Sequence, residues 1–146
     1  MEWLMPLRGK IIALDTAPLI YFIEKHPIFH LRVRPFFQAM QRGDFKVVTS
    51  TLTITEVQVY PVRHNNAKLA TMYREVLLHA DHLQTFPVTH DIAETAARLR
   101  VTHKLRTPDA IQVATAIVTG ADFFLTNDAR LSAVLNPTVL VLGNLQ

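Results

Sequence analysis

Residues 11–16 have the sequence Ile-Ile-Ala-Leu-Asp-Thr, in which four apolar residues are followed directly by an acid. A short continuous apolar run is typical of a strand in a parallel sheet whose two faces are both covered. The run therefore predicts a buried β-strand over Ile11–Leu14 that ends at Asp15.

Four further short runs, rich in β-branched and aromatic residues, alternate with helical stretches along the chain. They cover Phe45–Thr49, Leu83–Val88, Phe123–Thr126 and Val139–Leu142. Most of them are also continuous apolar runs, so we expect a mostly parallel sheet. The alternation predicts an α/β fold with a central five-stranded sheet flanked by helices.

The clearest helical pattern covers Asp91–Thr102, where apolar and polar residues would lie on opposite faces of a helix. A second helix is expected from Thr107, with Thr107 as N-cap, Pro108 at the first helical position and Gly120 just past the end. The remaining helices are expected over Pro18–Lys25, Ile28–Gln41 and, in two parts divided near Pro61 and Asn65–Asn66, Thr53–Ala80.

The composition fits one globular domain over residues 1–146, of which residues 1–9 form an extension before the first strand. The chain is 49% hydrophobic and 18% charged, which permits a buried core and is the opposite of the balance found in disordered chains. It contains no cysteine, which excludes disulfides, thiolate zinc sites and cysteine nucleophiles.

Two features bear on location and partners. The first residues lack the apolar core of a signal peptide, and the longest charge-free stretch, Ala110–Ala121, is far shorter than the roughly 20 apolar residues of a membrane span. We therefore expect a cytoplasmic protein with no membrane segment. The net charge of +3 is compatible with a polyanionic partner but is not specific for one.

Four acids fall where strands end or helices begin. Asp15 and Asp128 follow the first and fourth predicted strands, Glu56 lies early in the helix after the second strand, and Asp109 lies in the first turn of the helix before the fourth. In an open parallel sheet, functional sites form outside the carboxyl ends of the strands. Carboxylates that converge there repel one another unless a cation neutralises them, so the pattern indicates a metal site.

Each acid also has a structural interpretation. Asp15 could cap the following helix, Asp109 is favoured at a helix N-terminus by the helix dipole, and Asn127-Asp128 could form a turn. These interpretations compete with a functional role for each residue alone, whereas the convergence of all four acids favours the metal site.

Glu56 has a specific structural alternative, because Thr53-x-x-Glu56 has the spacing of a helix capping box. Against it, Glu56 shares a helical face with Leu52 and Tyr60, and this pattern places its side chain toward the interior. An unpaired carboxylate in the interior is costly, which favours a partner such as a metal ion.

Four segments that contain these acids resemble, in order and spacing, the signature of PIN-domain nucleases. They are Leu14-Asp15-Thr16-x-x-Leu19, Thr51-x-x-x-x-Glu56, Thr107-Pro108-Asp109-Ala110-Ile111-x-x-Ala114-x-Ala116 and Leu125-Thr126-Asn127-Asp128. Ala96-Ala97-x-Leu99-Arg100 is similar to the VapC-like toxin branch of that family. The resemblance implies a single three-layer PIN domain that hydrolyses RNA phosphodiester bonds with Mg²⁺ or Mn²⁺. For the VapC-like branch it also implies a small antitoxin protein as partner and a homodimer.

The acidic residue set itself suits Mg²⁺ or Mn²⁺ better than zinc, because hard divalent cations prefer carboxylate oxygens. We assign Asp15 and Asp109 as direct metal ligands, with Asp128 completing the metal shell directly or through water. Glu56 would orient a water molecule or hold a second metal. Four polar residues are expected to position the carboxylates through hydrogen bonds: Thr16, Thr51, Thr126 and Asn127.

Cationic side chains near the acids are candidates for binding RNA phosphates. They are Arg98, Arg100, Lys104 and Arg106, which precede Asp109, and Arg130, which follows Asp128. A solvated charged face is the alternative interpretation for each of them.

Other protein classes fit the pattern less well. An aspartate-nucleophile phosphatase needs a second acid two residues after the first, where this chain has Ala17. A receiver-like phosphoacceptor needs an acidic pair after the first strand and a lysine after the last, and no lysine follows Lys104. A PIN fold that has lost catalysis and serves as an interaction module is the alternative that stays open.

Overall fold

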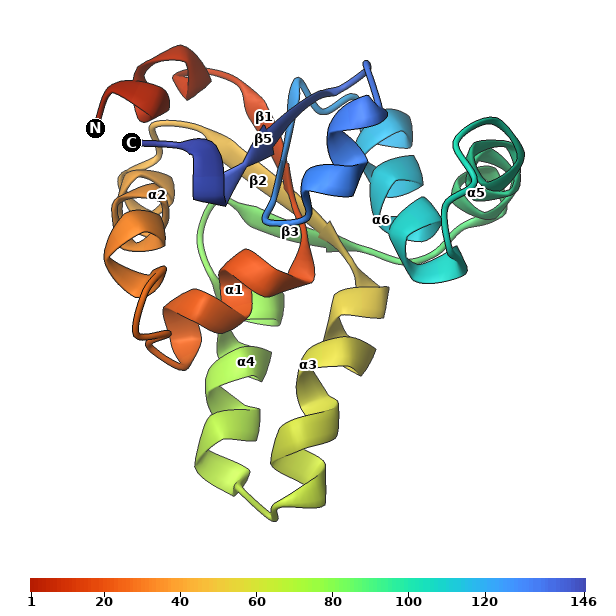
Figure 1. The fold of residues 1–146 in the computed structure, drawn as a ribbon. Coiled ribbons are helices and arrows are strands. Elements are labelled where there is room, and N and C mark those ends of the chain that lie inside the picture. Colours follow the sequence, from red (N-terminus) through yellow and green to blue (C-terminus); the bar gives the residue numbers. More distant parts are fainter.

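The five strands of the computed structural model, which describes residues 1–146, form one all-parallel sheet of order β3-β2-β1-β4-β5. Because the strands are parallel, their carboxyl ends lie at one edge, toward the starts of α1 and α3 in Figure 1. The strands are β1 (Ile11–Leu14), β2 (Lys46–Ser50), β3 (Leu83–Phe86), β4 (Phe123–Thr126) and β5 (Thr138–Val141).

Helices cover both faces of this sheet, which confirms the three-layer α/β architecture (Figure 1). One hydrophobic cluster joins the sheet to α1–α4, and a second joins it to α5 and α6. The α-helices are α1 (Thr16–Ile23), α2 (His30–Arg42), α3 (Thr51–Arg63), α4 (Ala67–His79), α5 (His90–Thr102) and α6 (Thr107–Val118). The short 3₁₀ helices are η1 (Glu2–Leu7), η2 (Ala129–Ala133) and η3 (Leu142–Asn144).

The central strand β1 shows why its sequence is continuously apolar. Ile12 and Leu14 pack into the cluster on the α1–α4 side, whereas Ala13 packs into the cluster on the α5–α6 side. Successive side chains of a strand point to opposite faces, so a strand covered on both faces needs apolar residues at every position. All three residues are at most 2% exposed.

Three strands differ slightly from the expected ranges. β2 covers Lys46–Ser50 instead of Phe45–Thr49. β3 ends at Phe86 instead of Val88, because the next residue is Pro87, which has no N–H to donate to a strand ladder. β5 covers Thr138–Val141 instead of Val139–Leu142, since Leu142 already begins η3.

The helix starts also differ from the expectation. Helix α2 begins at His30 instead of Ile28, α3 at Thr51 instead of Thr53 and α5 at His90 instead of Asp91. Helix α6 has Arg106, not Thr107, at its N-cap, although Pro108 lies in its first turn and Gly120 follows its end with a φ of 73°, as expected. Helix α1 begins at Thr16 instead of Pro18, because Asp15 caps it and Pro18 fits its first turn.

Helices α3 and α4 form a hairpin that extends away from the sheet (Figure 1). The first helix continues through Pro61, and the division falls at residues 64–66, where Asn66 caps α4 by accepting a hydrogen bond from the Leu69 N–H. The fully buried Tyr73 of α4 donates a hydrogen bond to Glu24 at the end of α1. This contact holds the hairpin against the rest of the domain.

The N-terminal extension packs on the same hydrophobic core as the rest of the chain. Leu7 is 1% exposed and belongs to the cluster on the α1–α4 side. The Trp3 ring stacks on Phe36 of α2 with 6.2 Å between the ring centroids. None of the helices has the length and apolar character that crossing a membrane requires.

Candidate active site

Asp15 lies at the carboxyl end of β1 and is held by two hydrogen bonds. Its Oδ1 accepts from the Thr16 N–H at 2.8 Å, and its Oδ2 accepts from the Thr126 hydroxyl at 2.7 Å. The first contact makes Asp15 the N-cap of α1, so the structural interpretation of this residue is correct. The second contact ties the carboxylate to the end of β4, which a simple helix cap does not require.

Thr126 connects two of the acids. Its hydroxyl donates to Asp15 and accepts a hydrogen bond from the Asp128 N–H at 3.0 Å. The side chain is fully buried, so this hydroxyl has no solvent to replace either contact. Thr126 therefore fixes the position of Asp15 relative to the segment that carries Asp128.

Glu56 does not form the capping box that its spacing suggests. Ser50 is the N-cap of α3, and its hydroxyl accepts from the Leu52 N–H at 3.1 Å. The Oε1 atom of Glu56 instead accepts hydrogen bonds from the Thr16 hydroxyl at 2.7 Å and from Gln112 Nε2 at 3.2 Å.

The side chain of Glu56 is directed to the acidic site, although the residue is exposed. The expectation that its helical face is buried is wrong, since Glu56 is exposed and Tyr60, one turn later, is 51% exposed. One carboxylate oxygen is therefore bound by neutral donors from the interior, while Oε2 makes no hydrogen bond with the protein.

A buried polar network joins Glu56 to the helices and strands around the site. Gln112 of α6, which is 3% exposed, places its Nε2 2.9 Å from the Thr53 hydroxyl and 3.2 Å from the Thr16 hydroxyl. Thr53 in turn lies 3.1 Å from the hydroxyl of Thr49, which donates to the Leu14 carbonyl at 3.0 Å. Because buried polar groups need partners, the network fixes α3 and α6 against the ends of β1 and β2.

Gln112 and Thr49 were not among the residues expected at the site, and Thr53 was considered only as a helix cap. A signal for Gln112 is present in the sequence, since it lies between Ala110 and Val113 on the helix face that is completely buried. A glutamine on such a face needs buried hydrogen-bond partners.

Thr51 and Asn127 lie near the site without contacting its acids. Thr51 is the first residue of α3 and makes no side-chain hydrogen bond. Asn127 donates to the Tyr21 hydroxyl at 3.1 Å and accepts from the Gly143 N–H at 2.8 Å. Asn127 therefore connects α1 and η3.

Asp128 and Asp109 face arginines. Arg130 contacts both carboxylate oxygens of Asp128, with Nε 3.0 and 3.2 Å from Oδ1 and Oδ2 and with Nη2 2.5 Å from Oδ2. Asp128 also caps η2 by accepting from the Arg130 N–H. Arg106 lies 3.9 Å from Asp109, a long and exposed ion pair.

The acids are close enough to affect one another's protonation. Burial raises the pKa of Asp15, and the negative charges of Asp109 and Glu56 raise it further, against the hydrogen bonds from Thr126 and Thr16. The negative charge of this site therefore disfavours the ionised form of its most buried carboxylate.

The pKa values of the two outer acids are shifted in opposite directions. Burial raises the pKa of Asp109; the nearby Arg106 opposes this, and the charges of Asp128 and Glu56 reinforce it. The hydrogen bonds from Arg130 lower the pKa of Asp128. A divalent cation near these acids would relieve the repulsion among them.

The acidic residue set matches a hard divalent cation in its chemistry, since all four candidate ligands are carboxylates. In the positions that the side chains adopt here, no three acidic or histidine side chains surround one point as metal ligands do. Arg130 and Arg106 lie against Asp128 and Asp109. A metal ion therefore fits the donor atoms, but these two ion pairs would have to open.

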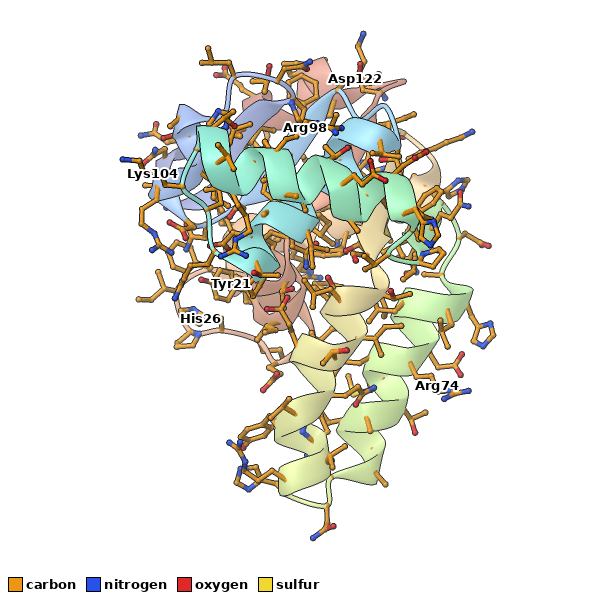
Figure 2. All side chains as sticks on the ribbon, turned by 90° about the vertical axis from the view of Figure 1, so that its right-hand side faces the viewer. Tyr21, His26, Arg74, Arg98, Lys104 and Asp122 are labelled. Carbon is orange, nitrogen blue, oxygen red and sulfur yellow. The ribbon has the colours of Figure 1, made fainter.

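The five candidate phosphate-binding residues do not form one cluster. Arg106 and Arg130 lie at the acids, whereas Arg100 and Lys104 are exposed and contact none of them. Arg98 donates to Thr95 on its own helix. Figure 2 shows Arg98 on α5 in the upper part of the view, well above Tyr21 of α1.

Comparison with known proteins agrees with this fold. The PIN domain family model matches residues 12–135. No curated protein sequence matches the chain.

Several solved structures are similar. VapBC2 from Rickettsia felis, bound to a DNA fragment from its promoter, has 16% identity and a TM-score of 0.71 over 89% of this chain and 97% of that chain. A toxin–antitoxin complex from Klebsiella pneumoniae has 22% identity and a TM-score of 0.67 over 90% and 97%. VapC20 from Mycobacterium tuberculosis, a sarcin-ricin loop cleaving toxin, has 19% identity and a TM-score of 0.69 over 84% and 93%. Because these identities are low, the similarity establishes the fold alone.

Proposed function

The chain belongs to the PIN domain family, and we propose that it is an endoribonuclease that depends on Mg²⁺ or Mn²⁺. The observation that carries the proposal is the set of hydrogen bonds that joins the acids at the carboxyl edge of the sheet. Thr16 donates to both Asp15 and Glu56, and Thr126 links Asp15 to the segment that carries Asp128. A helix cap or a turn explains single members of this group but not the side-chain contacts that Thr16 makes to Glu56 and Thr126 makes to Asp15.

In the proposed reaction, Asp15, Asp109 and Asp128 would hold the metal. The bound cation would activate a water molecule for attack on the RNA phosphodiester and stabilise charge on the attacked phosphate. Glu56 orients that water through Oε2, which is free of protein partners, while its other oxygen is fixed by Thr16 and Gln112. Arg106 and Arg130, at the rim, are positioned to contact phosphates of the RNA.

We further propose that the protein is the toxin of a VapBC-type pair, acts in the cytoplasm as a homodimer, and is blocked by a small antitoxin protein. Support comes from the fold, which matches toxin–antitoxin complexes from Rickettsia felis and Klebsiella pneumoniae over about nine tenths of this chain. Growth arrest on expression, relieved by coexpression of a small protein encoded next to this gene, tests this part. Unimpaired growth with active protein present contradicts it.

An RNA cleavage assay with and without Mg²⁺ or Mn²⁺ tests the catalytic proposal. Asp15→Asn and Asp109→Asn should each reduce cleavage on the order of 100-fold or more, because each removes a metal ligand. Asp81→Asn, at an exposed acid outside the site, is the matched control. Metal-dependent cleavage that survives both site substitutions would contradict the assigned site.

The catalytically silent PIN module is the second candidate. The observation that favours it is the engagement of Asp128 by Arg130, which leaves this acid already neutralised. A wild-type protein that binds a partner but neither binds Mn²⁺ nor cleaves RNA would select this alternative.

A further inference from the structure

A positively charged side chain of the protein, Arg130, lies at the acidic site. The Arg130 guanidinium contacts both oxygens of Asp128 through Nε and Nη2, in the two-pronged geometry that makes arginine–carboxylate pairs specific. Both residues belong to one short segment, in which Asp128 caps η2 and Arg130 lies within it. The pair can therefore form or open without a change elsewhere in the fold.

The two inner acids have no such partner. Asp15 and Glu56 receive hydrogen bonds only from an amide of the backbone, from hydroxyls and from Gln112. Such neutral donors hold a carboxylate in place without cancelling its charge. Asp128 is the one acid of the four whose charge is matched by a close, two-pronged ion pair.

The Arg130 side chain is 67% exposed, so water can replace its contacts when it leaves Asp128. Exposed ion pairs are weak, because both charges are well solvated when they separate. A divalent cation carries twice the charge of the guanidinium and binds carboxylate oxygens directly. A metal ion and Arg130 would therefore compete for the same two oxygens.

We propose that Arg130 is a built-in counter-ion that occupies Asp128 until a divalent cation displaces it, and that it thereby sets the metal concentration at which the site fills. This inference rests on the proposed function, since it takes Asp128 as a metal ligand. It makes Arg130 a positioning residue: it acts on the metal through Asp128.

The test is the affinity for Mn²⁺ alone, measured from the free Mn²⁺ signal by electron paramagnetic resonance without RNA. Arg130→Gln should bind Mn²⁺ about two- to fivefold more tightly than wild type, in line with the weakness of an exposed pair. Arg130→Lys keeps the charge but loses the two-pronged contact, so it should also bind more tightly, by a smaller factor. Lys104→Gln removes an exposed charge that contacts no acid and should change the affinity little.

The variants separate competition from a general effect of net charge. If Lys104→Gln tightens binding as much as Arg130→Gln does, while Arg130→Lys equals wild type, the effect is one of charge and the inference is wrong. Equal affinities in all four proteins also overturn it but leave the proposed function intact. Absence of Mn²⁺ binding in every protein overturns the proposed function, and the inference with it.

A second measurement observes Arg130 itself. In a titration of the wild-type protein with Mg²⁺, the nuclear magnetic resonance signal of the Arg130 Nε–H should shift over the concentration range in which the site fills. The reason is that its hydrogen bonds to Asp128 are lost. A signal that stays unchanged at saturating Mg²⁺ contradicts displacement.

Discussion

The inner and outer halves of the acidic site are built in different ways. The inner pair, Asp15 and Glu56, is joined to buried hydroxyls and to Gln112. The outer pair, Asp109 and Asp128, faces the exposed side chains of Arg106 and Arg130. A change in the inner half therefore disturbs folding and function together, whereas a change in the outer half acts through charge and leaves the fold intact.

Replacement of Gln112 should have the largest effect among the supporting residues. Gln112→Ala removes the buried donor that Thr16, Thr53 and Glu56 share, so we expect a loss of about 1–3 kcal/mol in the free energy of unfolding. RNA cleavage should fall by about 10- to 100-fold, as for other residues that orient metal-site groups.

Urea denaturation and cleavage assays check the two effects separately, with Gln38→Ala, at an exposed position of α2, as control. A variant that is destabilised but cleaves RNA at the wild-type rate under folding conditions would show that Gln112 stabilises the core and does not position the acids for cleavage.

Thr126→Val removes the hydroxyl that links Asp15 to the Asp128 segment. The hydrogen bond from Thr126 lowers the pKa of Asp15, so its loss should raise that pKa further. The acidic limb of the pH–rate profile should consequently move to higher pH, with cleavage at pH 6 reduced by about tenfold.

Thr126→Ser keeps the hydroxyl and should restore both the rate and the profile. If the valine variant loses activity equally at every pH, Thr126 does not act through the ionisation of Asp15.

The sequence predicts where the acids lie better than it predicts the buried partners of the inner acids. Apolar runs and the acids that follow them, such as Ile11–Leu14 and Asp15, are local features, and the strand order brings them to one edge. The arginines that face Asp109 and Asp128 lie within three residues of them in sequence. The buried partner of Glu56 is a long-range contact, since Gln112 meets Glu56 across 56 residues of sequence and no spacing rule specifies that encounter. For the same reason the local pattern suggested a role for Thr51, while Thr49 and Thr53 in fact join the network.

The cationic residues show a second limit of local patterns. Because Arg98 and Arg106 are close in sequence, the local pattern predicts that both lie near the acids. It does not specify the direction in which a side chain of α5 points. Arg98 donates to Thr95 on its own helix and contacts none of the acids, whereas Arg106 lies 3.9 Å from Asp109.

Addition of Mg²⁺ should stabilise the protein by relieving repulsion in both halves. Because burial raises the pKa of Asp15 and Asp109 above their ordinary value of 3.8, the stability tied to these groups is fully present below pH 3.8 and is lost as pH rises through their folded pKa. At neutral pH, Mg²⁺ at about ten times its Kd should add about 1.4 kcal/mol, or roughly 3–5 °C in Tm.

Thermal unfolding with Mg²⁺ and with EDTA measures this shift, and Asp15→Asn should diminish it. A shift of equal size in Asp15→Asn would mean that the cation binds elsewhere.

The smallest effect is expected at the rim, where Arg106→Gln and Arg98→Gln form a matched pair. Arg106 is 74% exposed and forms a long ion pair with Asp109, at 3.9 Å, so its loss should change the free energy of unfolding by less than about 0.5 kcal/mol. If Arg106 also contacts an RNA phosphate, KM for an oligonucleotide should rise about two- to threefold, and the dependence of log(kcat/KM) on log[salt] should become shallower by about one unit. Arg98→Gln removes the same charge from α5, where Arg98 contacts none of the acids, and should leave KM and the salt dependence unchanged. Equal effects of both substitutions would mean that RNA senses the overall charge of the domain, and the distinction between the rim of the site and the rest of the surface would then be lost.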